Sequence, residues 1–270
     1  MRARTVYHVA LHVFKESVRD KVLYNLVLFA VLLMAASFLI GQLTAGQDVK
    51  IIKDLGLAAI SVFGLFIAIF IGIGLVSKEV EKRSIYALLA KPVRRQELVA
   101  GKFAGLALTL AINIAIMAAV YFAMLAYYGW TEIETVQRAW EAPAADPNLL
   151  KPIVLIYLQL LIVNAIALFF STFTSPLMAA AFSLGLWVAG HFNADLRAFD
   201  TVVDAPAAGA LGKVLYYVLP NFASFDVKSV VVHGQHVPLG FIGMNAAYAA
   251  LYIGVLIIAS AMIFARRDFK

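Results

Sequence analysis

Residues 77–102 read SKEVEKRSIYALLAKPVRRQELVAGK and form the most densely charged stretch of a chain that is otherwise strongly apolar. Seven of these residues are Lys or Arg, and a hydrophobic run long enough to cross a bilayer lies on each side. Basic residues of membrane proteins concentrate in short cytoplasmic loops, so the pattern places this segment in the cytoplasm. The rest of the chain is then predicted to form an all-α integral membrane protein around it.

The charged segment also contains a short apolar patch, made of Ile85, Ala87, Leu88 and Leu89. Pro92 ends any helix here, because proline lacks an amide hydrogen and restricts the residue before it. The pattern predicts a short amphipathic helix facing the cytoplasm. A solvated loop that only fixes topology is an alternative interpretation, although such a loop has no use for exposed leucines.

The composition of the whole chain supports membrane insertion. Of its 270 residues 63% are hydrophobic and 14% are charged, against about 25% charged in an ordinary soluble domain. One transmembrane domain, residues 1–270, accounts for this length. The formal charge of +6 lies at the ends of the apolar runs, which indicates membrane topology rather than nucleic-acid binding. The absence of cysteine excludes disulfides, thiolate metal sites and cysteine nucleophiles.

Hydropathy predicts six spans with both termini in the cytoplasm, at about residues 22–40, 55–76, 103–128, 152–170, 177–192 and 240–265. In this arrangement the cytoplasmic segments hold 15 Lys and Arg against 6 Asp and Glu, whereas the outer segments hold 7 against 10. The asymmetry follows the positive-inside rule. We also expect the first span to stay in the protein, because no compact signal-peptide cleavage site follows it.

Two patterns predict how helices lie and pack. Residues 3–21 are expected to form an amphipathic elbow helix on the membrane surface, whose apolar face carries residues spaced by three and four. These residues are Tyr7, Leu11, Phe14, Val18 and Val22. In the second span Gly56, Gly64 and Gly72 recur every eight residues, which predicts a face where another helix approaches closely.

The outer segments contain candidate local structures. Residues 41–54 and 129–151 are expected to be loops, and residues 207–220 an interfacial helix tipped by Tyr216 and Tyr217. The sequence VVVHGQHVP is expected to form two short strands around a Gly234 turn. His233 and His236 flank that turn and could bind a metal, although a hairpin with polar tips explains them equally. His8 and His12 likewise fit a wet helix face better than a metal site.

Several catalytic classes lack their residues. No charged residue is placed in the middle of a predicted span, which argues against ion-coupled transport. The chain contains neither a His-Glu-x-x-His motif nor a Gly-x-Ser-x-Gly motif, and it has no phosphate-binding loop with its lysine. The protein is therefore expected not to be an enzyme, and any nucleotide hydrolysis that drives it belongs to another chain.

The order of motifs resembles type 2 ATP-binding-cassette (ABC-2) permeases. The resemblance rests on Glu79 and Glu81, then Lys82-Arg83-Ser84, the run from Ala87 to Val93, Arg95, Glu97 and Gly101-Lys102. Many members carry Gly-Thr where this chain has Arg83-Ser84. That variant, with Leu219-Pro220-Asn221-Phe222, Phe225-Asp226-Val227-Lys228 and the closing Ala265-Arg266-Arg267-Asp268-Phe269, is similar to the branch containing the permease accessory to nitrous oxide reductase.

The resemblance implies a permease subunit of an ABC exporter in the bacterial inner membrane. Such a protein forms a dimer, here expected to be a homodimer, and binds separate ATPase subunits that carry ATP and Mg. Residues 77–102 would be the coupling helix that docks on the ATPase. The residues expected to make this contact are Glu79, Glu81, Arg83, Ile85, Tyr86, Leu88, Leu89, Arg94 and Arg95.

The transport pathway is predicted less directly. Asn25 and Gly64, with aromatic neighbours, would suit a lipidic or amphipathic cargo, and Asn113 and Asn164 are further polar candidates within spans. Two alternatives stay open at this point. One is a mechanotransmitter that does not transport but acts on an outer partner through residues 193–239, and the other is a structural membrane subunit of a larger complex.

Overall fold

The computed structural model describes residues 3–41, 48–81, 95–193 and 206–266, which form helices and short connections without any strand. The elements are α1 (Ala3–Ser17), α2 (Lys21–Gly41), α3 (Asp48–Glu81), α5 (Arg95–Thr131), α6 (Glu134–Gln137), η1 (Pro147–Leu149), α7 (Leu150–Ser171), α8 (Pro176–His191), α11 (Pro206–Val218), η2 (Ala223–Phe225), α12 (Lys228–Val232) and α13 (Leu239–Arg266).

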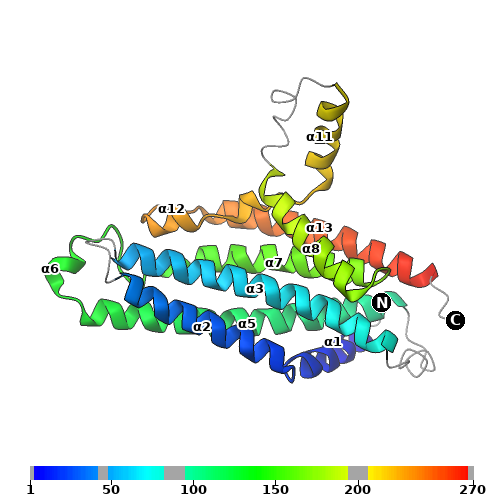
Figure 1. Ribbon diagram of the computed structural model, residues 1–270, viewed down its shortest axis with the longest axis horizontal. Helices are drawn as coiled ribbons and strands as arrows, with labels where there is room; N and C mark the ends of the chain where they lie inside the picture. The colour runs from blue at the N-terminus through cyan, green and yellow to red at the C-terminus, as the bar shows by residue number, and fades with distance from the viewer. Residues whose placement is uncertain (1–2, 42–47, 82–94, 194–205, 267–270) are drawn as a thin grey trace.

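Five of these helices, α2, α3, α5, α7 and α13, are long and apolar enough to cross a membrane, and they lie side by side along the long axis of the molecule (Figure 1). The helix α8 has 16 residues, or about 24 Å at 1.5 Å per residue, which is shorter than a hydrocarbon core of about 30 Å. All six predicted spans are therefore helical. Five of them are long enough to cross a membrane, and α8 is shorter.

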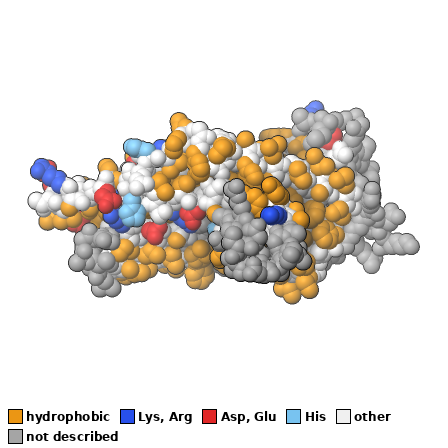
Figure 2. Space-filling view, turned by 90° about the horizontal axis from the view of Figure 1, so that it is seen from above, with side chains coloured by type: hydrophobic (Ala, Val, Ile, Leu, Met, Phe, Trp, Pro, Cys, Tyr) orange, Lys and Arg blue, Asp and Glu red, His pale blue; other side chains and the backbone are white. Residues whose placement is uncertain are grey.

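The two ends of the bundle differ. Both chain termini lie at one end, which we call the terminal end, whereas α6 and α12 lie at the other, which we call the capped end (Figure 1). Acidic, basic and His side chains gather toward the capped end, and hydrophobic side chains cover much of the remaining visible surface (Figure 2). This separation of charge from a broad apolar band is the pattern of a protein that spans a bilayer.

The helix α7 forms the centre of the bundle. Its residues 162–168 are all buried, and it packs against α3, α5, α8 and α13. The predicted glycine face of α3 is confirmed, because a Cβ atom at Gly64 would collide with Leu160 and one at Gly72 would lie 2.7 Å from Ala167. Gly56 meets the ring of Tyr121 in the same way. Bare backbone at these positions lets α3 approach its neighbours closely.

Residues 3–17 form the helix α1, and the side that packs on the bundle is not the apolar face predicted for the membrane surface. Its most buried apolar residue is Val13, whereas Tyr7 is 63% exposed. Val9 and Val13 pack on the bare backbone of Gly101 and Gly105 in α5. Their spacing of four places both on one side of α1. Two glycines facing two β-branched residues form a closer contact than the larger aromatic residues of the predicted face would permit.

Two further predictions about the capped end are corrected. Residues 48–54 were expected to be loop, but α3 begins at Asp48, because Val49 and Ile52 continue its buried face. The predicted strand pair is a short helix, α12, followed by a turn at Gly234 with φ of 70°. An isolated hairpin is marginal in water, whereas one helical turn buries Val231 and Val232 together.

The predicted interfacial helix is present as α11, which projects away from the bundle (Figure 1). Its C-terminal end is held by two contacts: Asn193 Nδ2 donates to the carbonyl of Tyr216 at 3.0 Å, and the Tyr252 hydroxyl donates to that of Val218 at 3.1 Å. The side chains of Val214, Tyr217 and Val218 are exposed.

Candidate functional site

The polar residues predicted to line a pathway are not gathered in one place. Asn164 on α7 and Gly64 on α3 are buried between these two helices, and Asn113 is buried on α5. Asn25 is exposed on α2. The structure thus brings Asn164 and Gly64 to the same seam between α3 and α7, and it leaves Asn25 on the surface of the bundle.

Asn164 stands out because its side chain is fully buried and neither amide atom makes a hydrogen bond. It packs on the bare backbone of Gly72, where an added Cβ would lie 3.1 Å from Asn164 Oδ1. Asn113 differs, since its Nδ2 donates to the carbonyl of Thr109 at 2.8 Å. An unsatisfied buried amide lowers the folding stability by about 1–3 kcal/mol. The packing of α7 gives no reason for an asparagine at position 164.

Asn164→Leu is therefore expected to stabilise the protein by about 1 kcal/mol, because a side chain of the same branched shape removes the unsatisfied amide. Thermal unfolding of the purified protein in detergent measures the change. Asn113→Leu is the matched control and should gain less, since it discards an existing hydrogen bond. A lower melting temperature for Asn164→Leu would contradict this interpretation.

A second polar contact joins α7 to the end of α8. Gln159 Nε2 lies 3.2 Å from His191 Nε2, and His191 Nδ1 lies 2.8 Å from the carbonyl oxygen of Trp187. A carbonyl oxygen only accepts, so Nδ1 donates to Trp187, and Nε2 is left to pair with the side-chain amide of Gln159. Spacing within α8 could have suggested the contact to Trp187, but nothing in the sequence pairs His191 with Gln159.

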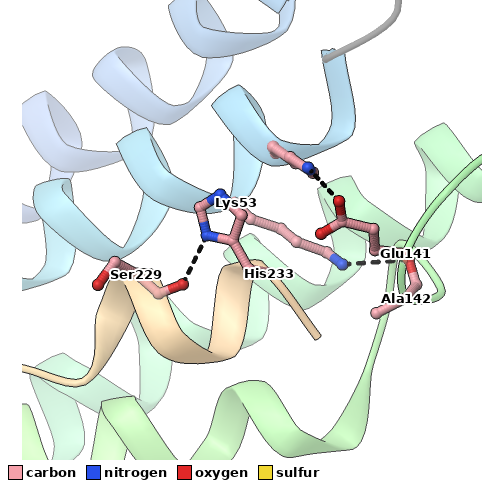
Figure 3. A network of polar contacts seen from close by, with 6 residues as sticks. Lys53, Glu141, Ala142, Ser229 and His233 are labelled. Atoms are coloured by element: carbon pink, nitrogen blue, oxygen red, sulfur yellow. Dashed lines mark hydrogen bonds and ion pairs between the residues drawn. The ribbon is translucent and has the colours of Figure 1, made fainter. Parts of the chain in front are cut away.

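The capped end is held by Lys53, a residue that the sequence pattern assigned to a loop. Its side chain is almost fully buried, and Nζ donates to the carbonyl of Ala142 at 3.3 Å (Figure 3). The same Nζ donates to the carbonyl of Pro143 at 2.8 Å. The Tyr121 hydroxyl in turn donates to the carbonyl of Lys53 at 3.0 Å. One lysine thereby ties α3 and α5 to the segment that follows α6.

An ion pair lies beside this lysine. Lys50 Nζ is 2.7 Å from Glu141 Oε1, and this hydrogen bond holds the pKa of the Glu141 carboxyl below its usual value. The depressed pKa means that the pair contributes stability above the unfolded-state pKa and loses it as the pH falls through the folded-state pKa. Glu141 is at the surface, so the contribution is small.

The weak metal candidates do not form a metal centre among the described residues. His233 Nδ1 lies 2.8 Å from the carbonyl of Ser229, and both His233 and His236 are exposed (Figure 3). In the described part of the chain no three His, Asp or Glu side chains are grouped to hold an ion. The contact to Ser229 is the ordinary bond of a histidine to its own helix.

The predicted docking segment lies mostly outside the described residues. The backbone at Glu79 and Glu81 forms the end of α3, and Arg95 begins α5. Arg83, Ile85, Tyr86, Leu88, Leu89 and Arg94 fall in the stretch that is not described. Next to it, Glu97 and Lys102 of α5 are buried, 2% and 3% exposed, which sequence reasoning missed because both lie in a charged stretch.

Comparison with known protein families places this helical bundle in one of them. The family model for ABC-2 family transporter proteins matches residues 7–269. This chain belongs to the ABC-2 transporter family. A search of curated proteins found no match to it.

Membership of the ABC-2 family describes the protein in general terms. An ABC-2 permease is a multi-pass membrane subunit of an ABC transporter and normally lacks an ATPase of its own. The family implies an ABC ATPase as partner in general. In this ABC-2 protein the buried seam between α3 and α7 contains the unsatisfied side-chain amide of Asn164.

Proposed function

We propose that the protein is the permease subunit of an ABC exporter, with the segment 77–102 docked on a separate ATPase and the terminal end facing the cytoplasm. The observation that carries the proposal is the length of the two flanking helices. The helices α3 and α5 have 34 and 37 residues, or about 51 and 56 Å at 1.5 Å per residue. A hydrocarbon core measures about 30 Å.

The excess length lets both helices project beyond the membrane, and Glu81 and Arg95 end them where the insert begins. A partner that binds the segment between these two helices would move their ends and so transmit movement into the bundle. The helix α3 is packed along α7 through Gly64 and Gly72, so a displacement of its projecting end would reach the seam that contains Asn164. This is the coupling that a permease without its own ATPase requires.

Leu88→Asp combined with Arg94→Glu is expected to abolish co-purification with a co-expressed ABC ATPase partner, because a buried charge and a reversed charge disrupt an apolar contact and its register. ATPase activity in liposomes should lose its dependence on the permease. Val136→Asp with Arg138→Glu is the matched control, since both residues are exposed at the capped end. Unchanged co-purification of the first pair would overturn the docking proposal.

A second candidate function is a mechanotransmitter that moves no cargo and acts on an outer partner. The observation in its favour is α11, whose exposed Val214, Tyr217 and Val218 project from the bundle. The two functions differ in one measurement. An exporter changes the leaflet or side of a labelled lipid in liposomes when ATP is supplied, whereas a mechanotransmitter hydrolyses ATP without moving it. We also propose that the protein belongs to the branch of the nitrous-oxide-reductase accessory permease and that it forms a homodimer.

A further inference from the structure

Two buried asparagines of the bundle bond to their own helices. Asn113 Nδ2 donates to the carbonyl of Thr109 at 2.8 Å, and Asn245 Nδ2 donates to that of Phe241 at 3.0 Å. Each bond joins residues four apart in a helix, where a carbonyl oxygen has a second lone pair to offer. Asn164 is 0% exposed and makes neither this bond nor a bond to any other residue that the structure describes. Its own helix therefore does not set the direction of its amide.

The amide of Asn164 faces α3 instead. A Cβ atom added at Gly72 would lie 3.1 Å from Asn164 Oδ1 and 2.7 Å from Ala167 Cβ, so the amide lies against bare backbone of α3. Asparagine side chains in membrane spans hydrogen-bond across to neighbouring helices, but here the amide makes no such bond with a described residue. A buried amide that is held by packing alone gains hydrogen bonds once the facing helix moves and water reaches it.

The half of α3 near the capped end is bonded to its neighbours. The Tyr121 hydroxyl of α5 donates to the carbonyl of Lys53 at 3.0 Å, and Lys53 Nζ donates to the carbonyl of Pro143 at 2.8 Å. Gly56 lies against the ring of Tyr121, and the helix α12 packs on α3 at this end (Figure 1). These contacts fix the capped half of α3 to α5 and to the segment that follows α6.

The half of α3 toward the terminal end meets α7 through small residues. Gly72 faces Ala167 there, and neither residue has a side chain that interlocks. Gly72 lies 19 residues beyond Lys53, about 29 Å along the helix, so a tilt of about 10° at the capped end moves Gly72 by about 5 Å, more than the width of a water molecule. The helix α2 packs along α3 and exposes Phe29 and Leu32, so it can move with α3 through lipid.

We propose that α3 pivots on its capped end and opens away from α7 at Gly72, and that water reaches Asn164 in the open arrangement. We call the contact of Gly72 with Ala167 and Asn164 the gate. With the gate closed the amide is unsatisfied, and with it open water donates and accepts at both amide atoms. An asparagine here keeps the two arrangements closer in energy than an apolar side chain would. The functional meaning of the gate rests on the proposed function, because the end that opens continues toward the segment 77–102, whereas opening itself requires no ATPase.

Distances between spin labels on the full chain in detergent, measured by double electron–electron resonance, test the proposal. The chain contains no cysteine, so introduced cysteines carry the labels without background. The gate pair is Phe70→Cys with Phe173→Cys, and the anchor pair is Asp54→Cys with Val154→Cys; all four of these side chains are exposed. We expect two distances for the gate pair, about 5 Å apart as the tilt requires, and one distance for the anchor pair.

Substitutions at Asn164 test whether this residue sets the balance. Asn164→Leu should lower the open population of the gate pair about tenfold, because an apolar side chain gains nothing from water. Asn164→Ala should lower it as well, and it covers the case in which leucine packs poorly. Asn113→Leu is the matched control and should leave both populations unchanged, since the amide of Asn113 is bonded within its own helix.

A single distance for the gate pair of the wild type, an equal spread in the two pairs, or populations that neither Asn164 variant changes would overturn the proposal. The sample contains no ATPase, so its outcome is distinct from that of the co-purification experiment. A bundle that shows one gate distance and still binds the ATPase would contradict the gate alone, whereas a gate that opens in a chain that binds no ATPase would contradict the exporter proposal alone.

Discussion

Gly105→Ile is expected to lower the free energy of unfolding by about 3 kcal/mol, because it inserts a branched side chain where α1 and α5 touch through bare backbone. A Cβ atom at Gly105 would lie 2.6 Å from the carbonyl oxygen of Ala10 and 2.7 Å from Val13 Cβ. The first of these contacts is with backbone, which cannot change rotamer to make room. The helix α1 must therefore separate from α5 or shift along it.

The same substitution at Gly185 of α8 is the matched control, since a Cβ there meets nothing within 4 Å. Ile is a better helix former than Gly, so Gly185→Ile should leave the melting temperature equal or slightly raised. Thermal unfolding in detergent, with hydrogen exchange of residues 3–17, measures both variants. A Gly105→Ile protein that melts with the wild type and keeps α1 protected would show that the α1–α5 contact contributes little.

Lys53→Met is expected to destabilise the protein by about 2–3 kcal/mol, because hydrogen bonds from a charged donor to two carbonyls are lost. Met retains most of the apolar stem of the lysine, so the loss reflects the bonds to Ala142 and Pro143 rather than a cavity. Hydrogen exchange should increase between residues 138 and 146, and the melting temperature should fall.

Lys15→Met is the matched control, as Lys15 is exposed on α1 and a surface change of this kind is usually worth less than about 0.5 kcal/mol. A second variant, Tyr121→Phe, removes only the hydroxyl that donates to the Lys53 carbonyl and should cost about 1 kcal/mol. If Lys53→Met behaved like Lys15→Met, water would have to replace the lysine at both carbonyls, and the anchoring role would be wrong.

Features that depend on the sequence of a single helix were predictable. The apolar runs located α2, α3, α5, α7, α8 and α13, because a segment that long and apolar satisfies its backbone hydrogen bonds only as a helix in lipid. The glycine face of α3 followed from a spacing of eight. The face of α1 that packs on α5 was not predictable from the sequence of α1. It depends on where Gly101 and Gly105 of α5 lie rather than on which residues of α1 are largest.

The sites were less predictable than the spans. Asn164 could be named from its place in an apolar run, but its lack of any hydrogen-bond partner depends on how α3 packs on α7. The anchor of α3 joins Lys53 to Ala142 and Pro143, and no periodicity within either segment points to the other. The strand pair was mispredicted because β-branched residues favour strands locally, while burial of Val231 and Val232 favoured one helical turn.

The sequence by itself determined that this is a helical membrane protein of the ABC-2 family with a charged insert between its second and third spans. Those properties follow from composition, from the length of each apolar run and from the order of short motifs, all of which are local along the chain. The tertiary structure alone decided that Lys53 is a buried anchor, that Asn164 is unsatisfied and that its amide faces Gly72 of α3. Each of these rests on contacts between residues far apart in sequence, where packing selects the partner.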